Sequence, residues 1–160
     1  MTKHSAKRRR QNRNFQNTPG TLRALPFIQN TQGTFNTVVG TVNQNVAYNA
    51  IASDLQSSRL VKLMHIRIDF APTVSGSGFP LVQLFIEDPT TNILVPVSRQ
   101  RALNMTTRTT IVAALPFMPL GFVQAGSGGT AFSIRATSGA VLALQYTLEA
   151  RFHLARDNVN

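Results

Sequence analysis

The sequence of 160 residues contains no cysteine and no tryptophan, and only six of its residues are acidic. Without cysteine, disulfides, cysteine nucleophiles and thiolate zinc sites are excluded, so packing alone must stabilise the fold. No apolar run approaches the ~20 residues of a membrane-spanning helix, and no apolar stretch follows the first basic residues as it would in a secretory signal. We therefore expect a single-domain cytosolic or nuclear protein with no membrane partner.

Charge is also scarce, because charged residues make up 14% of the chain and hydrophobic residues 42%. An average soluble domain contains about 25% charged residues. A body so poor in charge is typical of chains that bury much of their surface against copies of themselves, since large permanent interfaces resemble a domain core cut in half. The composition thus predicts a homo-oligomer.

The positive charge that is present lies mainly at the N-terminus. Sixteen Lys and Arg stand against six acids, and seven of the sixteen fall within the first thirty residues, before the first acid, Asp54. Each Lys or Arg that meets a phosphate releases a counterion, and the planar guanidinium of arginine pairs bidentately with phosphate. The predicted nucleic-acid-binding residues are Lys3, Lys7, Arg8, Arg9, Arg10, Arg13 and Arg23.

Residues 1–30 are therefore predicted to form a flexible basic arm, because they have little apolar surface to offset the entropy of ordering. The apolar residues 25–28 are expected to anchor this arm to the body, residues 31–160. A nuclear localisation signal matches the same short basic run.

From Thr34 onward the apolar residues alternate with polar ones, which is the period of a half-buried strand. In residues 61–70, one predicted face holds Met64, Ile66, Ile68 and Phe70, and the other holds His65, Arg67 and Asp69. Residues 141–154 alternate in the same way, and their predicted buried face consists of Leu142, Leu144, Tyr146, Leu148, Ala150, Phe152 and Leu154.

Shorter strands are predicted between turn-forming groups, over residues 34–42, 45–52, 80–88, 92–97, 107–116, 120–124 and 130–137. One helix is expected over 98–104, where Ser98 would cap the first turn and Asn104 would close the last. Eight or nine strands with scarcely a helix favour an all-β fold, an eight-stranded antiparallel jelly-roll sandwich preceded by the flexible basic arm.

Five further basic residues are candidates for extending the nucleic-acid surface, or for salt bridges and subunit contacts. They are Arg59, Lys62, Arg99, Arg101 and Arg108.

A hydrolase triad can be written with His65, Asp69 and one of the serines Ser53, Ser57 and Ser58. Four residues along a strand span about 13 Å, however, which is too far for the histidine and the carboxylate to share a hydrogen bond. We expect no enzymatic activity. The four acids Asp54, Glu87, Asp88 and Asp157 have no spaced ligand pattern, so no metal or cofactor is expected.

Three features together resemble the capsid proteins of small RNA viruses, above all the coat proteins of satellite viruses, which pair a short Arg/Lys arm with one jelly roll. They are the arm Lys7–Arg13, the long strand Arg59–Phe70 ending at Ala71-Pro72, and the final strand Val141–Leu154. The resemblance implies a structural protein of the virion, with the first jelly-roll strand long or broken over 34–52 and the helix between the fifth and sixth strands.

The resemblance also implies a T=1 icosahedral shell of sixty copies that packages single-stranded RNA, assembled in the cytoplasm or the nucleus of the host. Sixty arms would together carry about +420 charges, which suits a genome of several hundred to about a thousand nucleotides.

Two other classes of protein remain open. A cellular nucleic-acid-binding β-domain would explain the arm, and it predicts a monomer or small oligomer. A β-barrel enzyme of the cupin type would explain the strands, but it requires inward His and carboxylate clusters, and the chain has only three histidines.

Overall fold

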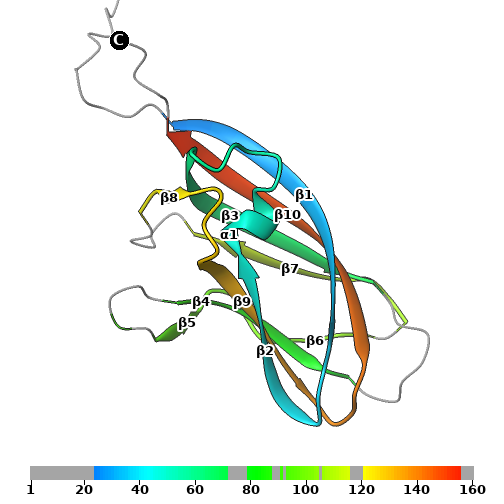
Figure 1. Cartoon of the computed structure of the whole chain (residues 1–160). Coiled ribbons are helices and arrows are strands. Elements are labelled where there is room, and N and C mark those ends of the chain that lie inside the picture. Colours follow the sequence, from blue (N-terminus) through cyan, green and yellow to red (C-terminus); the bar gives the residue numbers. More distant parts are fainter. Residues whose placement is uncertain are drawn as a thin grey trace, which may run out of the picture.

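The structure is a computed structural model that describes residues 24–71, 79–87, 91, 93–104, 106–115 and 121–155. The described chain forms two antiparallel sheets packed face to face (Figure 1). The first sheet has the order β1 (Ala24–Asn36), β10 (Ala143–Ala155), β3 (Leu60–Phe70), β7 (Thr109–Ala114), and β8 (Val123–Gln124) pairs with β3. The second has the order β2 (Gly40–Ala47), β9 (Thr130–Ser138), β4 (Leu81–Glu87), β5 (Leu94–Pro96), and β6 (Arg101–Ala102) pairs with β4.

These two four-strand orders are those of a jelly roll, which confirms the predicted all-β sandwich. The core lies between the sheets, as expected for sandwiches whose inner faces interdigitate. The first sheet contributes Leu63, Ile68 and Phe152 and the second contributes Leu84 and Phe132, all of them almost fully buried.

The turn that joins β1 to β2 is tied to the turn that joins β9 to β10. The backbone N–H of Thr37 donates to the Leu142 carbonyl at 2.8 Å. The Thr37 hydroxyl donates to the carbonyl of Ala140 at 2.7 Å and accepts from the N–H of Leu142 at 2.8 Å. Buried hydrogen bonds of this kind hold both turns at one end of the molecule.

The long strands β3 and β10 confirm the alternation expected of them, with one exception in β3. Pairing with β10 passes from Arg151–His65 to Phe152–Leu63, so Met64 has no partner on that strand. This β-bulge reverses the alternation, so that Leu63 is buried while Met64, predicted for the buried face, is only partly covered.

The expectation for residues 24–52 is wrong in two respects. The composition assigns residues 24–30 to the arm, yet they form the beginning of β1, which pairs with β10 over its whole length. Residues 34–52 are not one long or broken strand, because β1 and β2 belong to different sheets and the short helix α1 (Tyr48–Ile51) follows. Pairing with β10 orders a segment whose own sequence has only weak alternation. The expected anchor, residues 25–28, is thus part of a strand.

The predicted helix over 98–104 is also wrong, because this segment continues the edge of the second sheet. The Ser98 hydroxyl accepts a hydrogen bond from the backbone N–H of Leu84 at 2.9 Å, and the Gln83 side chain donates to the Ser98 carbonyl at 2.9 Å. Beyond this interruption, Arg101 and Ala102 pair with β4 as β6. Tertiary pairing overrides the local capping signal here.

Gly33 provides a test of the packing between β1 and β10. It lies opposite Tyr146 in the register, and a Cβ atom added at Gly33 would collide with the tyrosine ring. The ring also packs against Phe35 and Phe70, with centroids 6.3 and 6.0 Å away. Gly33→Ala should therefore lower the free energy of unfolding by about 1–3 kcal/mol, as overpacking does. Urea unfolding of the unassembled protein measures this.

Two comparisons make this prediction specific. Gly139→Ala places a Cβ in open space and should change stability by less than about 0.5 kcal/mol. In a Tyr146→Ala background the Gly33→Ala substitution should cost little. An equal cost with and without the tyrosine ring would contradict the packing explanation.

Candidate nucleic-acid and subunit interfaces

The seven predicted nucleic-acid-binding residues, Lys3 to Arg23, lie outside the described residues. The structure does place the point where they join the body. Ala24, the first described residue, pairs with Ala155, the last, so both ends of the described chain lie at the same end of the first sheet (Figure 1). The basic arm therefore enters the body beside the end of β10.

Two of the five further candidates, Arg59 and Lys62, lie near this end. The carbonyl of Arg59 accepts a hydrogen bond from the N–H of Ala125 at 2.8 Å, immediately before β3 begins. Lys62 lies opposite His153 in the pairing of β3 with β10.

The other three candidates, Arg99, Arg101 and Arg108, lie elsewhere, and their side chains are exposed. Arg99 and Arg101 line a shallow groove beside β7, together with Thr110 and Val112. Arg108 lines a different hollow on the first sheet. The five candidates thus fall into three places and form no single basic patch.

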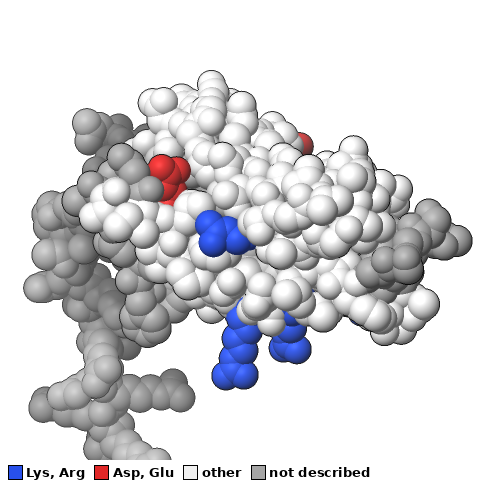
Figure 2. Space-filling model, turned by 90° about the horizontal axis from the view of Figure 1, so that it is seen from below, with Lys and Arg blue, Asp and Glu red and all other residues white. Residues whose placement is uncertain are grey.

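Much of the body surface is uncharged. Figure 2 shows the molecule from below the view of Figure 1, and most of this side belongs to uncharged residues, with isolated Lys, Arg and acidic side chains between them.

The outer face of the second sheet is also poor in charge, and some of its side-chain contacts join uncharged residues. Arg135 lies 4.1 Å from the ring centroid of Phe85 and donates to Asn43 at 3.0 Å. Neighbouring rungs of this face are joined by uncharged pairs, Ser133 with Asn45 at 2.6 Å and Thr41 with Thr137 at 3.0 Å. Apart from Arg135, the contacts named on this face join uncharged side chains, so the face carries little charge that would repel a second copy.

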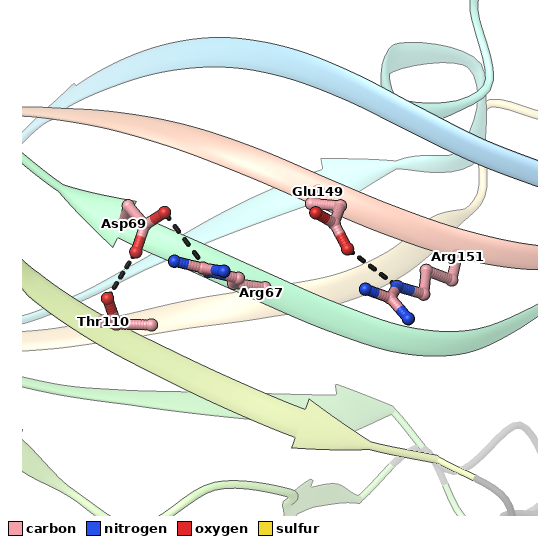
Figure 3. Close-up of polar contacts among 5 residues, drawn as sticks. All are labelled: Arg67, Asp69, Thr110, Glu149 and Arg151. Atoms are coloured by element: carbon pink, nitrogen blue, oxygen red, sulfur yellow. Dashed lines mark hydrogen bonds and ion pairs between the residues drawn. The ribbon is translucent and has the colours of Figure 1, made fainter.

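Four charged residues of the first sheet form two ion pairs (Figure 3). Arg67 Nε lies 3.3 Å from Asp69 Oδ2, and Arg151 Nε donates to Glu149 Oε1 at 2.7 Å. The Thr110 hydroxyl, on β7, donates to the other oxygen of Asp69. Two arginines and two carboxylates leave this part of the face without net charge, so it offers no excess cation to a phosphate. Each ion pair joins residues two positions apart on one strand, whereas the contact of Thr110 with Asp69 joins β7 to β3 and could not be found from the local sequence pattern.

His65 lies on the same face, opposite Arg151 in the register. Its Nδ1 atom is buried and has no hydrogen-bond partner among the described residues. Burial lowers the pKa of His65, and the charges of Arg151 and Arg67 lower it further, while Glu149 acts in the opposite direction.

The hydrolase triad that can be written from the sequence is not assembled. The partners of Asp69 are Arg67 and Thr110, and the Ser53 hydroxyl accepts a hydrogen bond from the side chain of Gln29 at 3.3 Å. His65 Nδ1 bonds to neither residue.

Within the described ranges, no group of three or more His, Asp or Glu side chains is arranged to hold a metal ion. Asp88 and Asp157, two of the acids considered, lie outside those ranges. Among the same residues, no helix has the length and apolar character needed to span a membrane.

The fold is similar to solved structures of viral coat proteins. The capsid protein of BFDV, crystallised as a decamer, superposes with a TM-score of 0.56 and 10% identity, over 84% of this chain and 100% of that chain. A chain of the semi-empty virus-like particle of the nodavirus of the giant freshwater prawn, Macrobrachium rosenbergii, gives 0.50 and 10%, over 83% and 96%.

No protein-family model and no curated protein sequence matches this chain. At such low identity the likeness shows the fold, and the chain therefore has the jelly-roll fold of small icosahedral virus capsid proteins.

His65 makes the body less stable at acidic pH than at neutral pH. Because its pKa in the folded protein lies below the ordinary 6.5, the imidazole takes up a proton more readily in the unfolded chain. The contribution of His65 to stability is complete above pH 6.5, where the imidazole is neutral in both states. It is lost as the pH falls below 6.5 toward the lower pKa of His65 in the folded protein. His65→Gln should therefore reduce the loss of thermal stability between about pH 7.5 and about pH 5.

Arg151→Gln should reduce that loss as well, because it removes a charge that lowers the pKa of His65. Arg101→Gln, whose charge does not act on His65, is the matched control. Thermal unfolding followed by circular dichroism measures all four proteins. Parallel pH profiles for wild type and His65→Gln would contradict this role of the histidine.

Proposed function

We propose that this chain is a viral coat protein that self-assembles into a small icosahedral shell of sixty copies and packages single-stranded RNA through its arm. The observation that carries the proposal is a capsid-type sandwich in a chain whose positive charge is concentrated ahead of that sandwich. The phosphate-binding residues in this proposal are Lys3, Lys7, Arg8, Arg9, Arg10, Arg13 and Arg23.

The charges of the described body support separate roles for the arm, which would bind phosphate, and for the body, which would form the contacts between subunits. Arg67 and Arg151 are paired with carboxylates, and Arg135 is held by Phe85 and Asn43. The exposed Arg99, Arg101 and Arg108 lie in two separate hollows and form no single basic patch, whereas the arm carries seven cations and no acid. We therefore assign phosphate neutralisation to the arm, and contact between subunits to the charge-poor body.

This division suggests an order of assembly. Seven cations on each arm repel those of neighbouring copies until nucleic acid neutralises them. Neutralisation then allows the uncharged surfaces of the bodies to associate. Because binding rests on released counterions, it should weaken steeply as the salt concentration rises.

Deleting residues 1–14 tests the arm. The deletion removes six of the seven arm cations and leaves Arg23 and the whole of β1 in place. The truncated protein should keep its β-sheet circular dichroism and lose its packaged nucleic acid, seen as a fall in the 260/280 nm absorbance ratio of purified particles.

A full-length variant in which Lys7, Arg8, Arg9, Arg10 and Arg13 are replaced by Gln is the matched control for chain length. It should lose nucleic acid in the same way. Retained packaging in both variants would contradict the role of the arm, and loss of folding in the deletion alone would show that the arm is structural.

Electron microscopy of the purified wild-type protein, with the absorbance ratio before and after nuclease, tests the whole proposal. Closed, uniform particles whose nucleic acid resists nuclease support a coat protein, and phenol extraction followed by ribonuclease or deoxyribonuclease identifies the genome. A salt-sensitive monomer that gives up all its nucleic acid would instead identify a cellular nucleic-acid-binding protein.

A further inference from the structure

The long strand β1 lies at an edge of the first sheet, and this edge has no partner in the described part of the chain. β1 has thirteen residues and pairs only with β10. No backbone hydrogen bond joins β1 to any other described segment. Half of its backbone N–H and C=O groups therefore point away from the sheet, available to another strand.

This edge lacks the charged side chains by which soluble proteins usually prevent strands from pairing between molecules. Between Arg23 and Asp54 the sequence contains no charged residue, so β1 carries none. The other outer strands of the two sheets are shorter, with eight residues in β2, six in β7 and three in β5. A long, uncharged, open strand is a template for the addition of a further strand.

The exposed side chains along this edge are uncharged as well, so they would not prevent a second strand from pairing with β1. Ile28, Asn30, Gln32 and Thr34 alternate along the outer face of β1 and are all exposed, Ile28 to 53%. Two copies of this row can approach without repulsion between charges, and Ile28 gains burial when they do.

We propose that β1 pairs with β1 of a second copy of this chain, antiparallel about a two-fold axis, so that the first sheets of two subunits join into one. An antiparallel strand pair is self-complementary, because residue i facing residue j requires residue j to face residue i, which is the condition for a two-fold contact. The pairing satisfies the open backbone groups of both subunits. The inference rests on the proposed self-assembly and names one of its contacts.

Single cysteines test the pairing cleanly, because the natural chain has none. Cysteine is introduced separately as Ile28→Cys, Asn30→Cys, Gln32→Cys and Thr34→Cys, and assembled particles are oxidised and separated on a non-reducing gel. Facing positions in an antiparallel pair have Cα atoms about 4.5–5.5 Å apart, within reach of a disulfide. Linked dimer should reach its maximum at one position and fall on both sides of it. If the axis passes through an odd-numbered residue, the maximum appears instead in a mixture of two neighbouring variants.

Gln145→Cys is the matched control. Gln145 is exposed on the same face, but β10 is paired on both sides, so no second copy reaches its backbone. We expect about tenfold more linked dimer at the best β1 position than at this control. Equal linking at the control would overturn the proposal.

A second pair of variants tests the energetic role of the edge. Asn30→Lys/Gln32→Lys places charge on the open edge and should prevent particle formation, whereas Gln145→Lys should not. Circular dichroism verifies that both variants fold.

The outcomes separate this contact from the proposed function. Wild-type shells without any β1–β1 disulfide overturn the edge pairing and leave the coat-protein proposal standing. Linking of β1 cysteines to Thr18→Cys in the arm of another copy, with no β1–β1 product, would also overturn the pairing, because the arm would then cover the edge. A wild-type protein that forms no particles overturns both.

Discussion

The pairing of β1 with β10 is the constraint on which most of the architecture depends. It extends over all thirteen residues of β1, from Ala24–Ala155 to Asn36–Ala143, and brings together the two ends of the described chain. One consequence is that the basic arm joins the body beside the end of β10. The other is that β1 becomes the outer strand of its sheet, which leaves one of its edges open.

The same pairing determines the local packing toward the Asn36–Ala143 end of the two strands. Tyr146 covers Gly33 because the two residues are opposite each other in this register. Nearby, Thr37 follows β1 directly and bonds to the carbonyl and N–H of Leu142, just before β10 begins. A shift of the register by one residue would break these contacts and would turn the apolar face of β1 away from the core.

Charge is distributed so that the body and the arm have different chemistry. On the first sheet, Arg67 and Arg151 are matched by Asp69 and Glu149, and exposed pairs of this kind contribute at most about 1 kcal/mol each to stability. Their effect is mainly to leave that face without net charge. The largest excess of positive charge precedes the fold in sequence, where seven Lys and Arg occur before the first acid, Asp54.

Residues 61–70 and 141–154 could be recognised as strands from the sequence, because every second residue is apolar over a long stretch and the buried face follows from that period. The basic run Lys7–Arg13 was equally evident, since a dense run of cations needs no fold to be found, and its role as a nucleic-acid-binding arm stays a prediction. The bulge at Met64 and the strand at 101–102 were not predictable in this way, because each depends on pairing with another strand. The two ion pairs join residues two positions apart on one strand, and only the hydrogen bond from Thr110 to Asp69 comes from a strand distant in sequence.

By itself, then, the sequence determined the class of fold, the charge of the arm and the apolar faces of its two longest strands, because these follow from composition and from a period of two. The tertiary structure alone decided that residues 24–30 form a strand, that Ser98 begins no helix, and that β1 has an open edge. The physical reason is that strand pairing connects residues distant in sequence, more than a hundred positions apart for β1 with β10 and about twenty for β4 with β6. No local pattern records which partner a strand will have.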